Sequence, residues 1–179
     1  MKNIVWIVAL VVIGVVGYAA AGPYLTIGAI KTGIVENDAE LLADNIEFPT
    51  LRQNLKEQFN IILMKSAAKE ADDNPLGLLL AGLATSLVDG LVDNFVTPSA
   101  LASVMEGREP PTGSTPSSRS PSTADRENLF RDARMSYDTL STFSVWVPND
   151  TGGETRFVLK RDGLSWKLVN IVIPMDTLD

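Results

Sequence analysis

The sequence lacks two residue types altogether: none of its 179 residues is a cysteine or a histidine. This absence excludes disulfides, thiol nucleophiles, Cys/His zinc sites and His-dependent catalytic triads. An active site built on carboxylates remains possible, but most catalytic chemistry is excluded, so we expect a non-enzymatic protein that uses no cofactor or metal. Basic residues are also scarce, with 15 Lys and Arg against 22 Asp and Glu, for a net charge of −7. Nucleic-acid binding needs a basic surface, so we expect no nucleic-acid partner.

The N-terminus carries a long apolar run. Residues 4–21 contain no charge and follow Lys2. As a helix they span about 27 Å, close to the bilayer's hydrocarbon core of about 30 Å. The run predicts a signal anchor in the membrane with the remaining chain exported. The alternative is a signal peptide cleaved near Ala21, where small residues precede Gly22.

Residues 23–106 have a helical pattern and form the first part of one exported domain. Pro23 is placed to open a helix, and Asn37 and Asp38 are placed to cap the helix end and the next short turn. Pro49 suits the first turn of an amphipathic helix whose apolar face holds Leu51, Leu55 and Phe59.

Residues 75–88 form a second uncharged run, too short to span a bilayer. This length favours a buried core helix, and the alternative is a helix that lies against the membrane. Thr97 and Pro98 then predict the start of another short helix.

The sequence pattern changes after residue 106. Residues 107–123 are almost entirely Gly, Pro, Ser and Thr, which predicts a flexible linker or loop. Residues 124–179 then show the alternation of strands and form the sheet part of the same domain. The fold class is therefore α+β: an N-terminal membrane helix (1–22), then several helices packed on a C-terminal antiparallel sheet of three or slightly more strands.

Asp162-Gly163 is the strongest turn signal in the sequence. A two-residue turn at these positions would pair Leu159 with Trp166 and Phe157 with Leu168. That register puts these four apolar side chains on one buried face, with Lys160 and Lys167 on the other. We expect the helix that holds Leu51 to cover the buried face.

Several short motifs resemble the bacterial family called domain of unknown function 2939. They are Pro23-Tyr24-Leu25, the run 47–52 with Leu55-Lys56, Val96-Thr97-Pro98 with Leu101, and the run 159–168 with Ile173-Pro174. Glu47 stands where the family pattern suggests Asp. The family has no established activity, so the resemblance implies where the protein is located and how it folds, but not what it does. The order of helices and strands is also similar to NTF2-like and cystatin-like folds, by analogy alone.

Five residues are candidates for a binding site. Asp89 and Asp93 stand one helical turn apart and would bind a cation, form a solvated stripe or pair with a base such as Arg52. Arg52 would bind an anion or, as we favour, pair with Glu47 or Asp44. Trp146 and Trp166, together with Tyr137, would line a pocket between sheet and helices or belong to the core.

Two functions follow as expectations. The first is a membrane-anchored, non-enzymatic binding or protein-interaction module of the bacterial cell envelope. It would be held in the inner membrane by residues 4–21, with its domain in the periplasm and an envelope protein as partner. If residues 1–21 were cleaved off, the domain would be periplasmic or secreted. The second is an NTF2-like pocket protein that carries or senses a small apolar ligand, and a cavity of a few hundred Å³ would favour it.

Overall fold

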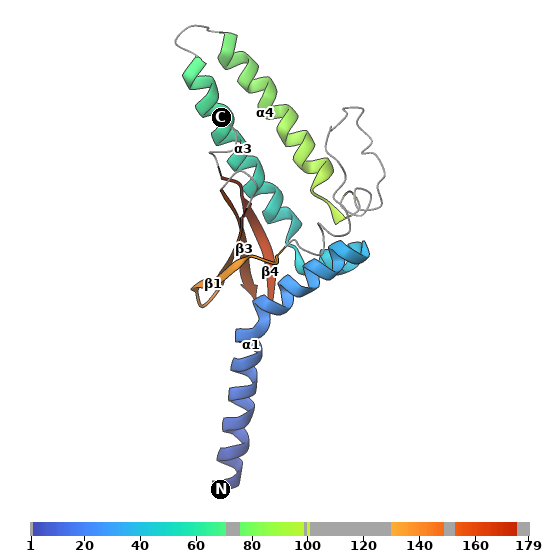
Figure 1. Cartoon of the computed structure of the whole chain (residues 1–179), viewed down its shortest axis with the longest axis vertical. Coiled ribbons are helices and arrows are strands. Elements are labelled where there is room, and N and C mark those ends of the chain that lie inside the picture. Colours follow the sequence, from blue (N-terminus) through green and yellow to red (C-terminus); the bar gives the residue numbers. More distant parts are fainter. Residues whose placement is uncertain (1, 71–75, 99, 101–129, 149–152, 175–179) are drawn as a thin grey trace.

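The computed structural model describes residues 2–70, 76–98, 100, 130–148 and 153–174, and within them it forms a helical layer on an antiparallel sheet (Figure 1). The helices are α1 (Lys2–Glu36), α2 (Ala39–Asn45), α3 (Phe48–Glu70) and α4 (Leu76–Phe95). The strands are β1 (Arg134–Thr139), β2 (Thr142–Pro148), β3 (Glu154–Asp162) and β4 (Ser165–Val172). The predicted α+β class and the order of helices before strands are confirmed. The predicted linker, residues 107–123, lies outside the described residues.

Helix α1 is one continuous helix of 35 residues, with Pro23 inside it. The prediction that a separate helix opens at Pro23 is therefore wrong. Proline in a helix removes one hydrogen bond and causes a kink, but it need not end the helix when other groups take over the lost bond. Figure 1 shows the bend between the part of α1 that projects from the fold and the part that lies beside the sheet.

The two halves of α1 have opposite environments. In the first half, the large apolar side chains from Ile4 to Val15 are about half exposed or more, with Trp6 72% exposed. In the second half, Ile27 and Ile30 are buried in the core. Within the described residues, α1 is the one helix that is long and apolar enough, by length and composition, to cross a membrane.

Asn37 and Asp38 shape the turn from α1 to α2, as predicted. Asn37 has a φ of 57°, the left-handed conformation that commonly ends helices. The Asp38 carboxylate caps α2 by accepting a hydrogen bond from the Leu41 N–H at 2.9 Å. Helix α3 then begins at Phe48, one residue before the predicted Pro49.

The sheet is an antiparallel meander in the order β1-β2-β3-β4. Strand β1 was not predicted, because it has only Met135 and Tyr137 as large apolar residues and all of it but Met135 is exposed. The apolar sheet face carries Phe143, Val145, Leu159, Trp166 and Leu168, all buried.

The β3–β4 register differs from the predicted one by two residues. Asp162 pairs with Ser165, so the turn consists of Gly163 and Leu164, and Leu159 pairs with Leu168 rather than with Trp166. Gly163 sits at the first turn position with a φ of 62°, where glycine is favoured. A shift of two keeps the side chains between Leu159 and Leu168 on their predicted faces, so the prediction that Leu159, Trp166 and Leu168 share the buried face is confirmed. Beyond Leu159 a bulge shifts the register once more, so Phe157 pairs with Ile171 and the predicted pair with Leu168 is wrong.

Three helices, not one, cover this face. Leu51 and Leu55 of α3 join the core as predicted, together with Leu42 of α2 and Ile27 and Ile30 of α1. Helix α3 also protects the open edge of β4, since Asn54 Nδ2 donates to the Val169 carbonyl at 2.8 Å. The predicted packing of several helices on the sheet is confirmed, and the part of α1 beyond Pro23 shares this face with α3.

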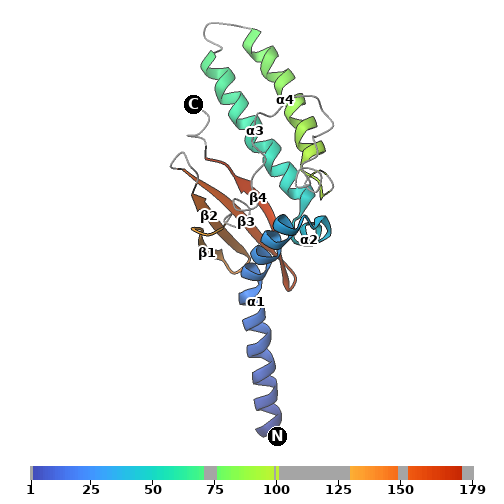
Figure 2. The same ribbon diagram turned by 45° about the vertical axis from the view of Figure 1, so that its right-hand side comes forward.

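Helix α4 packs along α3 and forms with it a helical hairpin that extends away from the N-terminal end of α1 (Figure 2). Among its described side chains only Val92 is buried, whereas Leu87 is 69% and Leu91 47% exposed. The prediction of a buried core helix is therefore wrong for this part of the run. After α4, the Ala100 N–H donates to Thr97 Oγ1 at 3.1 Å, as in a helix N-cap.

Candidate functional site

The candidate site lies where α1 bends, because the proline there leaves a backbone carbonyl to be satisfied. A helical residue normally donates its N–H to the carbonyl four residues earlier, which for position 23 is the Ala19 carbonyl. Pro23 has no N–H. Trp166 of β4 supplies the missing donor, with its Nε1 3.2 Å from the Ala19 oxygen. A strand residue thus completes the hydrogen bonding of the helix at the bend.

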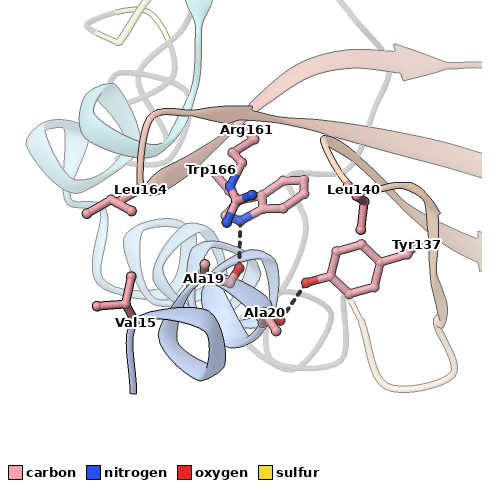
Figure 3. Close-up of a pocket in the computed structure, with 8 residues that line it drawn as sticks. All are labelled: Val15, Ala19, Ala20, Tyr137, Leu140, Arg161, Leu164 and Trp166. Atoms are coloured by element: carbon pink, nitrogen blue, oxygen red, sulfur yellow. Dashed lines mark hydrogen bonds between the residues drawn. The ribbon is translucent and has the colours of Figure 1, made fainter. Parts of the chain in front are cut away.

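Tyr137 of β1 adds a hydrogen bond at the next position, since its hydroxyl donates to the Ala20 carbonyl (Figure 3). On the far side of Pro23, the Thr26 hydroxyl donates to the backbone carbonyl of Trp166 at 3.0 Å. Side chains from both layers therefore fasten the bend of α1 to the first and last strands of the sheet.

Close packing accompanies these hydrogen bonds. A Cβ placed on Gly22 would lie 2.5 Å from Cδ1 of Trp166, so the indole ring occupies the space that any larger residue would need. Phe143 packs edge-to-face against both Tyr24 and Tyr137, with ring centroids 5.0 and 4.9 Å apart. The bend is consequently a fixed junction between helix and sheet.

Beside this junction lies a pocket of about 370 Å³, here called the junction pocket. One wall comes from α1, and the other comes from the two hairpins β1–β2 and β3–β4 (Figure 3). Its lining residues are Val15, Ala19, Ala20, Tyr137, Leu140, Arg161, Leu164 and Trp166. The pocket is mostly apolar, with a phenol and a guanidinium as its polar side-chain groups.

The Tyr137 phenol of the pocket has a shifted pKa. Burial raises the pKa of the Tyr137 phenol above its ordinary value of 10, and Tyr24 adds to the rise, whereas the positive charge of Arg161 opposes it. The phenol therefore stays protonated and remains a hydrogen-bond donor at neutral pH. Within the described part of the chain, no carboxylate forms a salt bridge with Arg161, whose guanidinium lies 5.8 Å from the Trp166 ring centre.

The structure separates the two candidate tryptophans. Trp166 is 2% exposed and belongs both to the core and to the pocket wall, so both readings of it hold. Trp146 lies on the opposite sheet face, where the Arg134 guanidinium stacks on it at 4.1 Å from the ring centre. Successive side chains of a strand point to opposite faces, and Val145, next to Trp146, is buried in the core. Trp146 therefore points away from the core, and the expectation that it lines the same pocket is wrong.

The charged candidates form no shared site. Asp93 of α4 makes a salt bridge with Lys56 of α3 at 2.6 Å, and not with Arg52. No salt bridge between Arg52 and Glu47 or Asp44 occurs within the described residues. Glu47 pairs instead with Lys167 at 3.8 Å, because its own N–H bonds to the Leu168 carbonyl and places it beside β4.

Asp89 is half-buried on α4, one turn before Asp93. In the part of the chain that the structure describes, no three acidic side chains gather closely enough to hold a metal ion.

Sequence reasoning missed the residues that give the pocket its rim. Leu140 is 88% and Leu164 60% exposed, each in a hairpin turn where a polar residue is usual. A leucine in each of two turns was the available signal. Arg161 was seen only as part of the hairpin, and its position beside Trp166 depends on the true register.

A comparison with known protein families matches residues 12–104 to the family described as "Protein of unknown function (DUF2939)". The match covers just over half of the chain. The chain therefore belongs to the DUF2939 family. The matched residues run from the first half of α1 to beyond α4, and the motif at 159–168 lies outside them.

No curated protein and no solved structure matches the chain. The likeness of this DUF2939 protein to NTF2-like and cystatin-like folds therefore stays an expectation. Its site has to be interpreted from its own residues.

Proposed function

We propose that this DUF2939 protein is a membrane-anchored, non-enzymatic binding module of the bacterial cell envelope. The observation that carries the proposal is the change of environment along α1. Its first half exposes an unbroken apolar surface, and its second half is built into the domain core. An apolar surface of that length on a single helix requires a nonpolar environment, and a bilayer supplies one.

The junction favours an anchor that stays attached to the domain, rather than a signal peptide that is cleaved off. Cleavage after Ala21 would cut within the helix and remove Ala19 and Ala20, the acceptors of the Trp166 and Tyr137 hydrogen bonds. The buried indole N–H would then lose its partner, at a cost of about 1–3 kcal/mol. A leader peptide that is discarded would not normally be part of the finished fold.

The charge pattern supports export of the domain. Lys2 precedes the apolar run, and the next charged residue is Lys31, within the part of α1 that belongs to the domain. Positive residues stay on the cytoplasmic side of the inner membrane, so the domain would lie in the periplasm.

Fractionation of bacterial cells that express the full chain tests this function. We expect the protein in the membrane fraction, resistant to extraction at alkaline pH, with Met1 or Lys2 at its N-terminus. A reporter enzyme that is active only in the periplasm should be active when fused after residue 179. A soluble protein that begins at Gly22 would overturn the anchor.

A second function, binding of a small apolar ligand, is favoured by the junction pocket. Its volume of about 370 Å³ falls in the range of small-molecule sites, and most of its lining is apolar. A fluorescent fatty acid, titrated into the full chain in nanodiscs, should bind saturably to the natural protein and weakly to Leu164→Asp. Equal binding by both proteins would exclude the pocket as its site.

A further inference from the structure

The junction pocket lies beside the outer part of the span that a membrane anchor would make. Val15 and Ala20 stand about 16 and 24 Å beyond Ile4 along the helix, at about 1.5 Å per residue. The hydrocarbon core is about 30 Å thick. With Ile4 at the cytoplasmic edge of this core, the helix wall of the pocket faces the outer half of the bilayer.

The opposite wall of the pocket, formed by the two hairpins, lies at the same end of the domain as the projecting part of α1. Figure 2 shows the turns of both hairpins beside α1, at the end of the sheet from which the helix projects. Leu140 and Leu164 occupy these turns and are among the exposed large apolar residues of the domain. They line the pocket opposite Val15 and Ala19 of the helix, so apolar side chains of the span and of the hairpins meet there.

Arg161 gives the rim of the pocket a charge. Its guanidinium borders both the apolar wall and the Trp166 ring. No carboxylate pairs with it among the described residues, so it can bind an external anion. Guanidinium groups bind phosphate oxygens through two parallel hydrogen bonds, and Tyr and Trp side chains commonly lie at the headgroup level.

We propose that the junction pocket binds a phospholipid of the outer leaflet, with an acyl chain between α1 and the two hairpin turns and its phosphate on Arg161. This inference rests on the proposed anchoring and names the ligand of the second proposed function. A lipid satisfies both features of the pocket, since it combines a long apolar chain with an anionic group at one end. The hairpin turns would thereby hold the domain against the membrane surface.

The lack of cysteine makes the test direct, because any introduced cysteine is the only one in the chain. Leu140→Cys and Leu164→Cys carry an environment-sensitive fluorophore in the full chain, reconstituted in phosphatidylcholine vesicles. Lipids brominated in their acyl chains should quench both labels strongly. Leu87→Cys on α4 is the matched control, because it replaces an exposed leucine far from the pocket and should be quenched little.

Val12→Cys, within the exposed first half of α1, separates the two proposals. Quenching at position 12 but not at 140 or 164 would overturn the lipid site and leave the anchor standing, with the pocket open to water or to a protein. No quenching at position 12 would overturn the anchor itself.

The role of Arg161 is tested by lipid preference at the Leu164→Cys label. Brominated phosphatidylglycerol should quench about fivefold more effectively than brominated phosphatidylcholine at equal mole fraction, as expected for one basic residue at an anionic surface. Arg161→Gln should abolish this preference, and Arg52→Gln, the same charge change on α3, should retain it. A preference that Arg161→Gln leaves unchanged would overturn the assignment.

Discussion

Trp166 has two roles that a single residue type rarely combines. Its ring fills the core at 2% exposure, and its Nε1 donates to the carbonyl that Pro23 leaves free. Tryptophan suits this position because it is the largest apolar side chain with a single donor. The sequence predicted the burial of Trp166 from its place in the hairpin. It did not predict the helix partner, because Ala19 and Trp166 are far apart in the chain.

Gly22 should be intolerant of any side chain. In Gly22→Ala the new Cβ would overlap the buried Trp166 ring, so we expect a loss of about 1–3 kcal/mol in the free energy of unfolding. Gly28→Ala, in the same helix, meets nothing within 4 Å and should stabilise by up to about 1 kcal/mol. Denaturant unfolding of both variants in mild detergent measures the difference. Similar effects of the two changes would contradict the close packing at Gly22.

Tyr137 should make stability depend on alkaline pH. Below about pH 10 the phenol is protonated in both folded and unfolded chains, so it adds no pH dependence. Its pKa is raised in the folded state, so the unfolded chain ionises first and the free energy of unfolding falls as the pH rises above about 10. Unfolding measured from pH 8 to 11 should show a smaller fall in Tyr137→Phe. The same pH dependence in both proteins would argue against a protonated Tyr137 at the junction.

At the scale of elements, local signals located most boundaries and missed the contacts between elements. The caps at Asn37 and Asp38 and the start of α3 follow from side-chain chemistry next to the backbone, so they were predictable. The β3–β4 register was not, because both registers put the same residues on the buried face. Strand β1 was missed because an exposed edge strand needs few apolar residues.

The contact between α3 and the edge of β4 depends on Gln58. Its Nε2 donates to the Ile171 carbonyl at 2.9 Å and to Asn170 Oδ1 at 3.0 Å, and its Oε1 accepts from the Ile173 N–H at 3.3 Å. Gln58→Ala should therefore lower the free energy of unfolding by about 1–3 kcal/mol.

Gln53→Ala is the control for this change. Gln53 lies on the same helix, is exposed and bonds only to Glu57 one turn away, so its loss should stay within about 0.5 kcal/mol. Denaturant unfolding compares the two variants. An equal loss in both would show that the Gln58 hydrogen bonds do not stabilise the sheet edge.

For the whole molecule, the sequence predicted the order of the apolar segment, the helices and the strands. It did not predict that the apolar segment and the first helix of the domain are one continuous helix. Charge and hydropathy divided the chain at Pro23 into a membrane segment and a domain. The structure instead runs one helix through both, because Trp166, Tyr137 and Thr26 fasten the bend to the sheet. Such a connection depends on residues more than a hundred positions apart, which no local pattern shows. The candidate site lies at this connection, so the sequence alone did not bring Arg161, Leu140 and Leu164 together as one site.

The run 107–123 should be dispensable for folding. Its Gly, Pro, Ser and Thr residues offer little apolar surface to bury, and shortening a loop changes its closure entropy by only about 0.6 kcal/mol per halving. Replacing it with eight Gly and Ser residues (about half its length) should leave the unfolding midpoint nearly unchanged in a thermal scan. Loss of cooperative unfolding in this variant would show that the run packs on the domain.

The hydrogen bond between Trp166 and Ala19 joins residues 147 positions apart, and this separation has a consequence for biosynthesis. Chains are made from the N-terminus at about 5–20 residues per second, so Ala19 is synthesised about 7–30 s before Trp166. During that interval the Ala19 carbonyl has only water or another temporary partner. The bend of α1 therefore becomes fixed only after β4 is translated, and a chain truncated before position 166 would carry α1 with an unsupported bend.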